Sequence, residues 1–393
     1  MEYRFSDRMQ GISGNAIREI FKLLDNPEVV SFAGGMPATD CLPVARFRQM
    51  CDRLLSSPDA PVLLQYGATE GYLPLRRRLA EFVGRCGIGG ISEDNVLVVT
   101  GGQQGIDLTY KIFINPGDAV LVEDPTYLAA LHIAKTYQAR AIGVRSGEEG
   151  IELEDLEAKI KAEHPKIFYI VPNFSNPTGK TLSAEKRKAI AELCAAHGVM
   201  VLEDDPYREL RYSGEPLPAI KSFDRAGNCI YLFSFSKTIS PAMRVGAVVA
   251  EPEVIRKLTV GKQATDVHTA TLLQAVAYEF IKDDTLDQQI ARSVPLYREK
   301  RDVMLEALDR CMPASFTHTR PEGGLFIWGE FDPASKISAK AKFREAVENK
   351  VAYVCGNDFF ADGRGDNCVR LNFSNETAER IVLGCERLGK LFG

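Results

Sequence analysis

A lysine stands among hydroxyl side chains, at the end of a predicted strand, in Ser234-Phe235-Ser236-Lys237-Thr238-Ile239-Ser240-Pro241-Ala242-Met243-Arg244-Val245-Gly246. Lys237 can form a Schiff base if its surroundings hold the amine partly neutral. The hydroxyl groups of Ser234 and Ser236 and the guanidinium of Arg244 can bind a phosphate dianion. The stretch therefore suits an aldehyde cofactor that carries a phosphate.

The same residues allow two other interpretations. Ser234 and Lys237 match the S-x-x-K pattern of serine acyl-transfer enzymes such as the penicillin-binding proteins. That pattern requires companion S-D-N and K-T-G segments, and neither string occurs in the 393 residues. A surface lysine in a serine-rich turn is the other possibility, and the rest of the chain has to decide.

Residues 199–203 form an apolar run that is typical of a strand buried in a parallel sheet. Asp204 and Tyr207 follow its end. A carboxylate beside a pyridine nitrogen keeps the nitrogen protonated, and a phenol can donate to a ring hydroxyl oxygen. Asp204 and Tyr207 are therefore candidates to bind a pyridine ring, whereas Asp205 is expected to close the turn.

Two further strands are predicted over residues 167–171 and 119–123. The first is followed by a turn that contains Asn176, whose amide can donate to the same ring oxygen. Asn173 in that turn is expected to be structural. The second strand is followed by Tyr127, which is either a packed aromatic residue at a helix start or a side chain that stacks on a cofactor.

A glycine-rich turn follows the predicted strand over residues 96–99. It contains Gly101, Gly102 and Gln103 and leads into a helix that is expected to end near Phe113. Backbone N–H groups at the start of such a helix bind phosphate, with help from the helix dipole.

Taken in their order along the chain, from the glycine-rich turn to Arg244, these motifs resemble those of the class I/II pyridoxal-phosphate (PLP) aminotransferases of fold type I. The resemblance implies an α/β fold, in which a large domain with a doubly wound, mainly parallel sheet binds PLP beyond the carboxyl ends of its strands. A smaller α+β domain completes the chain. We expect the large domain over 46–285 and the small domain over 1–45 and 286–393.

The resemblance also implies roles for single residues. Lys237, Asp204 and Tyr207 would be catalytic. The cofactor site would comprise Gly101, Gly102, Gln103, Tyr127, Asn176, Asp204, Tyr207, Ser234, Ser236, Lys237 and Arg244. The family often has a serine where Gly102 stands, so backbone amides of Gly102 and Gln103 would have to replace one hydroxyl contact to phosphate.

Substrate-binding residues are expected near both ends of the chain. Arg370 lies in an apolar strand, and a buried guanidinium requires an anion, either a substrate α-carboxylate or a structural carboxylate. Gly35 resembles the family's glycine at the active-site entry, where Asn176 would also contact substrate. Residues 15–24 resemble the N-terminal helix of 2-aminoadipate aminotransferases, in which Arg18 would either meet a distal carboxylate or remain a surface residue.

Tyr66 belongs to a stretch, residues 65–71, that resembles the family's Q-Y-x-x-x-x-G segment. In that family the tyrosine reaches the phosphate of the partner subunit. The resemblance therefore implies a homodimer with shared active sites, to which Tyr66 contributes a cofactor contact.

The activity implied is transfer of an amino group from an L-amino acid (2-aminoadipate, aromatic or branched-chain) to 2-oxoglutarate. It would follow a ping-pong mechanism through a Lys237 aldimine. A PLP-dependent β-lyase or decarboxylase on the same fold is an alternative, because the motifs do not distinguish these reactions. A non-catalytic effector-binding module is the third, and the full set of polar cofactor residues argues against it.

Composition limits the partners and the location. The net charge is −5, and basic residues are scattered rather than clustered, so no nucleic-acid partner is expected. The nine cysteines contain no C-x-x-C, which favours reduced thiols in the cytoplasm, and the five histidines lack metal-ligand spacing. No stretch is long and apolar enough to predict a membrane span.

Overall fold

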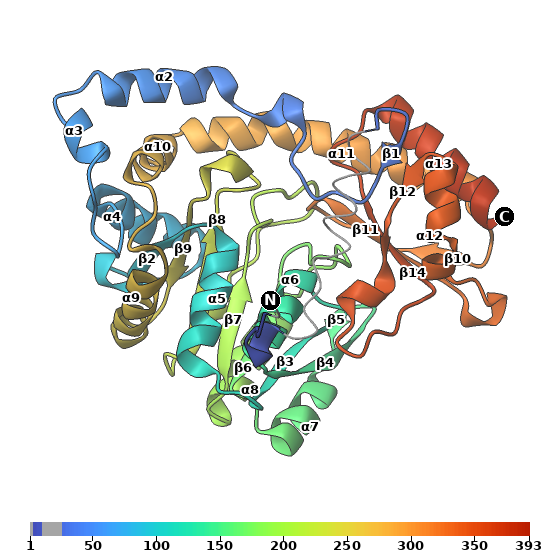
Figure 1. Cartoon of the computed structure of the whole chain (residues 1–393), viewed down its shortest axis with the longest axis horizontal. Coiled ribbons are helices and arrows are strands. Elements are labelled where there is room, and N and C mark those ends of the chain that lie inside the picture. Colours follow the sequence, from blue (N-terminus) through green and yellow to red (C-terminus); the bar gives the residue numbers. More distant parts are fainter. Residues whose placement is uncertain (1–2, 10–25) are drawn as a thin grey trace.

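The computed structural model describes residues 3–9 and 26–393. Its centre is an eight-stranded sheet (Figure 1). In spatial order its strands are β2 (Val96–Val99), β9 (Gly246–Val249), β8 (Cys229–Ser234), β7 (Met200–Asp204), β6 (Ile167–Ile170), β3 (Ala119–Asp124), β4 (Arg140–Gly147) and β5 (Gly150–Ile151). The strands from β8 to β4 pair in parallel, and β9 and β5 are antiparallel to their neighbours. The prediction of a mainly parallel α/β sheet is confirmed.

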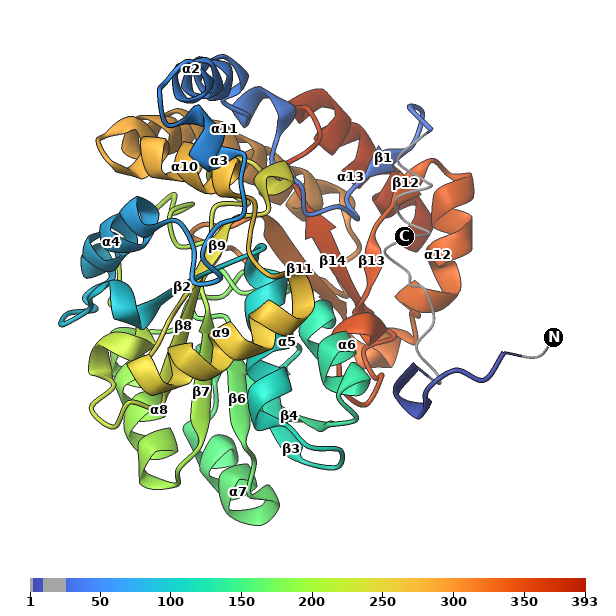
Figure 2. The ribbon, with the colours of Figure 1, turned by 60° about the vertical axis from the view of Figure 1, so that its left-hand side comes forward.

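Helices cover both faces of this sheet (Figure 2). The covering helices are α4 (Leu73–Phe82), α5 (Gly102–Phe113), α6 (Leu128–Thr136), α7 (Leu153–Glu163), α8 (Ala184–Ala196), α9 (Pro252–Asp266) and α10 (Thr271–Ile281). Neighbouring residues of β3 show the division: Val120 belongs to the same apolar cluster as Leu108 of α5, whereas Leu121 belongs to a second cluster with Leu156 of α7 and Ile190 of α8. Side chains alternate between faces along a strand, so continuous apolar runs fit a sheet that is covered twice.

A second, antiparallel sheet is formed by the C-terminal part of the chain, with strand order β10 (Phe316–His318), β11 (Phe326–Phe331), β14 (Cys368–Asn372) and β13 (Val354–Cys355). Next to it, β1 (Val30–Ser31) pairs in parallel with β12 (Val351–Ala352), so a segment near the start of the chain joins the C-terminal part. Figure 1 shows this region beside the central sheet.

The remaining helices connect or cover these parts. They are α2 (Val44–Leu55), α3 (Ala60–Leu63), α11 (Thr285–Cys311), α12 (Ala339–Glu348) and α13 (Ala378–Phe392). The long helix α11 runs from the region of α10 to α13, against which it packs. None of the helices within 3–9 and 26–393 has the length and apolar character that crossing a membrane requires.

Candidate active site

The carboxyl ends of β2, β3, β6, β7 and β8 converge on a cavity of about 290 Å³, which β11, β14 and residues 33–36 close from the other side. Its lining includes Gly34, Gly35, Met36, Gly102, Gln103, Tyr127, Leu128, Tyr169, Asn176, Asp204, Tyr207, Ser234, Ser236, Lys237, Arg244, Phe326, Val354 and Arg370. A larger hollow of about 890 Å³ adjoins Gly179 and Arg320, but none of the predicted site residues lines it. The smaller cavity is therefore the candidate active site.

Lys237 extends into this cavity from the turn after β8. Its amine donates a hydrogen bond to the carbonyl oxygen of Gly35 at 2.7 Å. Burial lowers the pKa of Lys237 to about 8, and the positive charges of Arg370 and Arg244 act in the same direction, while Asp204 opposes them. The amine is thus partly neutral near pH 8, which a lysine nucleophile requires.

Asp204 forms the end of β7 and is 5% exposed. Its carboxylate accepts a hydrogen bond from the Tyr169 hydroxyl at 2.7 Å. Burial raises the pKa of Asp204 to about 7; the Tyr169 hydrogen bond and the charge of Lys237 partly offset this, and Asp205 adds to it. In the described part of the chain, no cation forms an ion pair with this carboxylate. A cationic ring nitrogen is the kind of partner that it lacks.

Arg370 is held in place from three sides. It donates to the Asn176 side-chain oxygen at 3.1 Å and to the carbonyl oxygens of Ala33 and Gly34 at 2.8 and 3.0 Å. The first contact directs the NH₂ group of Asn176 away from Arg370, which leaves it available as a donor. Tyr207 is buried beside them, and this burial raises the pKa of its phenol, while the positive charge of Arg370 partly offsets the effect.

The guanidinium of Arg370 also lies over the rings of Phe326, at 4.4 Å, and Phe359, at 5.2 Å. Burial lowers the pKa of Arg370 to about 10. Its Nε atom is buried without a hydrogen-bond partner in the described structure. A buried, incompletely satisfied guanidinium suits a carboxylate ligand that grips it with two oxygens.

The phosphate-binding candidates gather at the start of α5. Gly101 has φ +78°, and a Cβ atom there would lie 2.4 Å from the guanidinium of Arg244, so a glycine is required for this close approach. Gly102 begins α5, whose first N–H groups lack intrahelical acceptors. The Ser234 hydroxyl donates to that of Ser236 at 3.0 Å. Amides, hydroxyls and a guanidinium thus surround one end of the cavity.

Three further predictions concern Gly35, Tyr127 and Tyr66. Gly35 lines the cavity, and a Cβ atom there would lie 3.1 Å from the ring of Phe326. Tyr127 also lines it, and burial raises the pKa of its phenol. Tyr66 does not line the cavity of its own chain: its side chain is 82% exposed and meets the ring of His268 edge-on at 5.8 Å. Arg18 lies outside the described residues.

Several lining residues were not predicted from the sequence, and two of them, Tyr169 and Phe326, contact predicted site residues directly. Tyr169 points from β6 to the Asp204 carboxylate, and Phe326 on β11 contacts both Arg370 and, edge-on at 5.8 Å, Tyr207. The register between β6 and β7 brings Tyr169 level with Leu202, two residues before Asp204. No local sequence pattern reports this register.

Comparison with known proteins agrees with the geometry. Residues 27–388 match the family described as aminotransferase class I and II. The chain is 39% identical to aromatic-amino-acid aminotransferase 1 of Thermococcus litoralis, over 99% of this chain and 94% of that protein. It is 40% identical to 2-aminoadipate transaminase of Thermus thermophilus, over 96% of this chain and 94% of that protein.

Among solved structures, the kynurenine aminotransferase of Pyrococcus horikoshii, in complex with PMP, superposes with a TM-score of 0.94 at 38% identity. The alignment covers 99% of this chain and 96% of that one. The chain therefore belongs to the class I and II aminotransferases of fold type I. It is a PLP-dependent aminotransferase, and the residues around its cavity fit that cofactor, since they supply a lysine amine, a carboxylate without an ion-pair partner and a turn whose amides and hydroxyls suit a phosphate.

Proposed function

We propose that this enzyme transfers the amino group of an L-amino acid to 2-oxoglutarate, with 2-aminoadipate, aromatic and branched-chain amino acids as donors. The observation that carries the proposal is the buried guanidinium of Arg370, which shares one cavity with the Lys237 amine. An α-carboxylate on Arg370 would bring the substrate's α-carbon to the same cavity as that amine. Because donor and acceptor both carry this carboxylate, each can use Arg370 in turn, as a ping-pong sequence requires.

In this proposal each residue has a separate task. PLP, when bound, supplies an aldehyde that joins the substrate amine and a ring that withdraws electrons from the α-carbon. Asp204 keeps the ring nitrogen protonated, while Tyr207 and Asn176 donate to the ring oxygen. Lys237 holds PLP before substrate arrives, and then its free amine removes the proton from the substrate's α-carbon.

The remaining predicted cofactor contacts complete the proposal. Tyr127 would stack on the ring. The phosphate would be bound by Gly101, Gly102, Gln103, Ser234, Ser236 and Arg244. Gly35 would leave room for the substrate beside Asn176.

The choice of amino donor depends on the walls of the cavity. Among its described lining residues the cations are Lys237, Arg244 and Arg370, each with a role assigned above. Met36 and Val354 provide apolar wall, which suits aromatic and branched side chains. A distal carboxylate, as in 2-aminoadipate, would therefore have to be met by a residue such as Arg18. The relatives include a 2-aminoadipate transaminase and an aromatic-amino-acid aminotransferase, so both donor classes are proposed.

We further propose a homodimer with shared sites and a cytoplasmic location. The exposed Tyr66 supports the first, because its side chain is available to another subunit. All nine cysteines are free thiols, which supports a reducing compartment. We also propose that residues 46–285 form the large domain and that residues 1–45 and 286–393 form the small domain. The central sheet falls within 46–285 and the second sheet within 286–393, which supports this division.

A single-turnover experiment tests the proposed activity. The long-wavelength absorbance of the PLP-bound protein is followed while one amino acid is added without oxo acid, and 2-oxoglutarate is then added. We expect the absorbance to be lost and then restored, with release of the donor's oxo acid in the first step. Ammonia or carbon dioxide in that step would instead indicate a β-lyase or a decarboxylase.

Lys237→Ala is the matching variant. It should lack the long-wavelength absorbance and lose turnover by at least about 10⁴-fold, because no other group supplies both the covalent link and the base. Retention of the band or of turnover in a folded Lys237→Ala protein would contradict the assignment of this lysine.

A further inference from the structure

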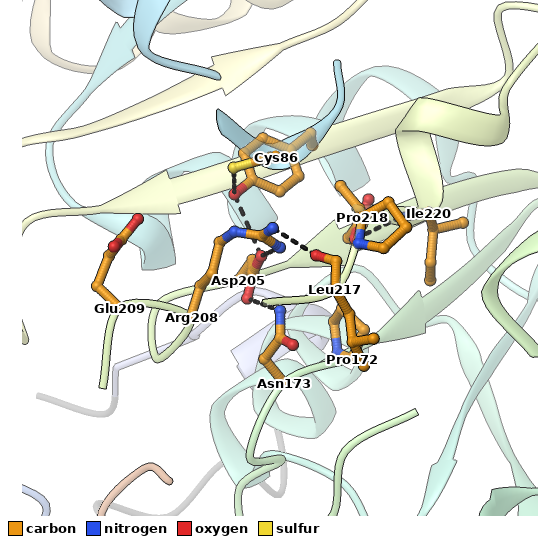
Figure 3. A network of polar contacts seen from close by, with 12 residues as sticks. Cys86, Pro172, Asn173, Asp205, Arg208, Glu209, Leu217, Pro218 and Ile220 are labelled. Carbon is orange, nitrogen blue, oxygen red and sulfur yellow. Dashed lines mark hydrogen bonds and ion pairs between the residues drawn. The ribbon is translucent and has the colours of Figure 1, made fainter. Parts of the chain in front are cut away.

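A buried polar network lies behind the active-site cavity, between the turns that follow β6 and β7. Asp205 comes directly after β7 with a fully buried carboxylate, and Asn173 lies in the turn after β6 and is 1% exposed. The Asn173 amide donates to the carboxylate of Asp205 at 2.7 Å (Figure 3). Neither residue lines the cavity. The network is thus separate from the groups that face the cofactor.

On its other side, Asn173 contacts a buried cation. The guanidinium of Arg187, on α8, donates to the Asn173 side-chain oxygen at 2.7 Å. It also donates to the carbonyl oxygens of Leu182, Pro218 and Pro172 at 2.9, 3.0 and 3.0 Å. Asn173 therefore bridges a buried cation and a buried anion. Buried charges are tolerated only when they are hydrogen-bonded, so this geometry is tightly constrained.

Asp205 is fixed independently of Asn173. Its carboxylate accepts hydrogen bonds from the Tyr231 hydroxyl at 3.2 Å and from Arg208 at 3.4 Å. Its backbone N–H donates to the carbonyl oxygen of Leu232 at 2.9 Å. Figure 3 shows Asp205 between Arg208 and Asn173. The contacts with Tyr231 and Leu232 attach the start of the turn after β7 to the neighbouring strand β8, and the contact with Arg208 lies within the turn itself.

We propose that Asn173 and Asp205 are positioning residues that hold two cofactor-facing turns in register. Asn173 lies three residues before Asn176, and Asp205 stands between Asp204 and Tyr207 in the chain. Their hydrogen bond is a direct polar link between the two turns, which the chain itself connects only through the whole of α8 and β7. The proposal rests on the function proposed above, in which Asn176, Asp204 and Tyr207 face PLP.

The network also affects the pKa of Asp204, which faces the cavity. The buried negative charge of Asp205 adds to the effect of burial in raising the pKa of Asp204. A more basic Asp204 carboxylate holds a protonated ring nitrogen more firmly. Asp205 thus supports Asp204 electrostatically, while its link to Asn173 fixes the position of the Asn176 donor.

The test compares two substitutions in this network. Asn173→Leu has similar volume and removes both hydrogen bonds of the amide, and with them the link between the turns. Tyr231→Phe is the matched control, because it removes a donor to Asp205 but leaves that link in place. Each PLP-bound variant is examined for its PLP dissociation constant and for the pH midpoint of its long-wavelength absorbance, and its thermal unfolding is measured to establish that it is folded.

We expect Asn173→Leu to raise the PLP dissociation constant about tenfold, the size expected when a buried hydrogen bond is lost. Its pH midpoint should rise by about half a unit or more, because a displaced Asn176 no longer draws electron density from the ring oxygen. Tyr231→Phe should lower the unfolding temperature and leave both quantities unchanged.

Unchanged affinity and midpoint in a folded Asn173→Leu protein would overturn the proposal. Equal shifts in both variants would do so too, because general destabilisation would then explain them. If Asn173→Leu does not fold, Asn173→Ser serves, since its short hydroxyl cannot reach both Arg187 and Asp205, and the same expectations apply. Absence of the long-wavelength absorbance from the wild-type protein would contradict the proposed function itself, whereas its presence with unshifted variants contradicts only the positioning role.

Discussion

At the scale of single residues, the fold buries Asp204 and gives it Tyr169 as a donor. Its pKa is raised from 3.8 to about 7, so the folded protein binds a proton that the unfolded chain releases between these values. Stability therefore falls as the pH rises through this interval, and above pH 7 the folded cofactor-free protein holds a buried, unpaired carboxylate. The same carboxylate is the group proposed to pair with the PLP ring nitrogen.

Asp204→Asn should therefore stabilise the cofactor-free protein while it disables the enzyme. At pH 8 the free energy of unfolding should increase by roughly 1–3 kcal/mol, and the gain should shrink towards pH 5, where the wild-type aspartate is protonated in the fold. Turnover should fall by about 10²-fold or more, because an amide cannot keep the ring nitrogen protonated. Thermal unfolding with and without PLP, and steady-state kinetics, measure both effects. A cofactor-free variant less stable than wild type at pH 8 would contradict this account.

Arg370 and Arg244 allow a comparison of two guanidinium groups in one cavity. Arg370→Lys should lower kcat/KM roughly 10- to 100-fold for the amino acid and the oxo acid alike, since an ammonium cannot grip a carboxylate with two parallel hydrogen bonds. Arg244→Lys should instead weaken PLP binding and leave the KM of amino donors nearly unchanged at saturating PLP. Kinetics and PLP titrations of the two variants distinguish these outcomes, and an exchange of the two effects would show that the roles are wrongly assigned.

At the scale of elements, the turn from β2 into α5 depends on a backbone conformation. Gly101→Ala would place a methyl group 2.4 Å from the Arg244 guanidinium at φ +78°. Gly117 is a matched control, because it has φ +90° and no atom lies within 4 Å of the position that the methyl group of an alanine would occupy. Gly117→Ala should cost about 1 kcal/mol of stability, and Gly101→Ala should cost more, because φ +78° with ψ 167° suits only glycine and its methyl group would meet Arg244. Only Gly101→Ala should weaken PLP binding, by about tenfold or more, as measured by titration of the cofactor-free protein.

The strands also show which features of the fold the sequence predicts and which it does not. Apolar runs that end in polar residues predicted β6, β7 and β8, because a strand buried on both faces leaves a continuous local pattern. The Lys237, Asp204 and Asn176 turns follow from those ends. Tyr169 was not predicted, since its contact with Asp204 depends on strand register, which is set by packing across the whole sheet.

Asn173 and Asp205 illustrate a different limit. The sequence predicts each as a structural turn residue, and their buried contacts agree with that interpretation. The link between them joins two turns that are more than thirty residues apart in the chain. Propensities describe single turns, so they do not report a hydrogen bond that forms only when two strands lie side by side.

At the scale of the whole molecule, one segment connects the proposed phosphate-binding turn to the loop that carries Tyr66. Asp266, at the end of α9, accepts a hydrogen bond from the Thr100 hydroxyl at 2.7 Å. Two residues on, His268 accepts from the Gly67 N–H at 3.2 Å. Val267 between them has φ 64° and ψ −61°, a strained conformation for a β-branched residue. The segment thus fixes the loop that would reach a partner relative to the chain's own cofactor turn.

Exposed apolar side chains lie near that loop in the sequence and on α9. Val62, Leu64 and Val260 are 64%, 69% and 65% exposed. Burial of such side chains stabilises a subunit interface by roughly 25 cal/mol per Å² of apolar surface. In the proposed dimer these side chains would be covered, and Tyr66 would reach the partner subunit's site.

Complementation between two impaired variants tests this arrangement. Tyr66→Ala and Lys237→Ala should each be impaired alone, the first by weaker PLP binding and the second by loss of the nucleophile. After the two are unfolded, mixed in equal amounts and refolded, about half of the dimers should be mixed, and one of the two sites in each should have both Lys237 and the partner's intact tyrosine. Activity should therefore recover to about a quarter of wild type, because half of the dimers each regain half of their sites. Recovery would require that the tyrosine acts across the interface, whereas a mixture no more active than the average of its components would place Tyr66 in its own subunit's site or outside any site.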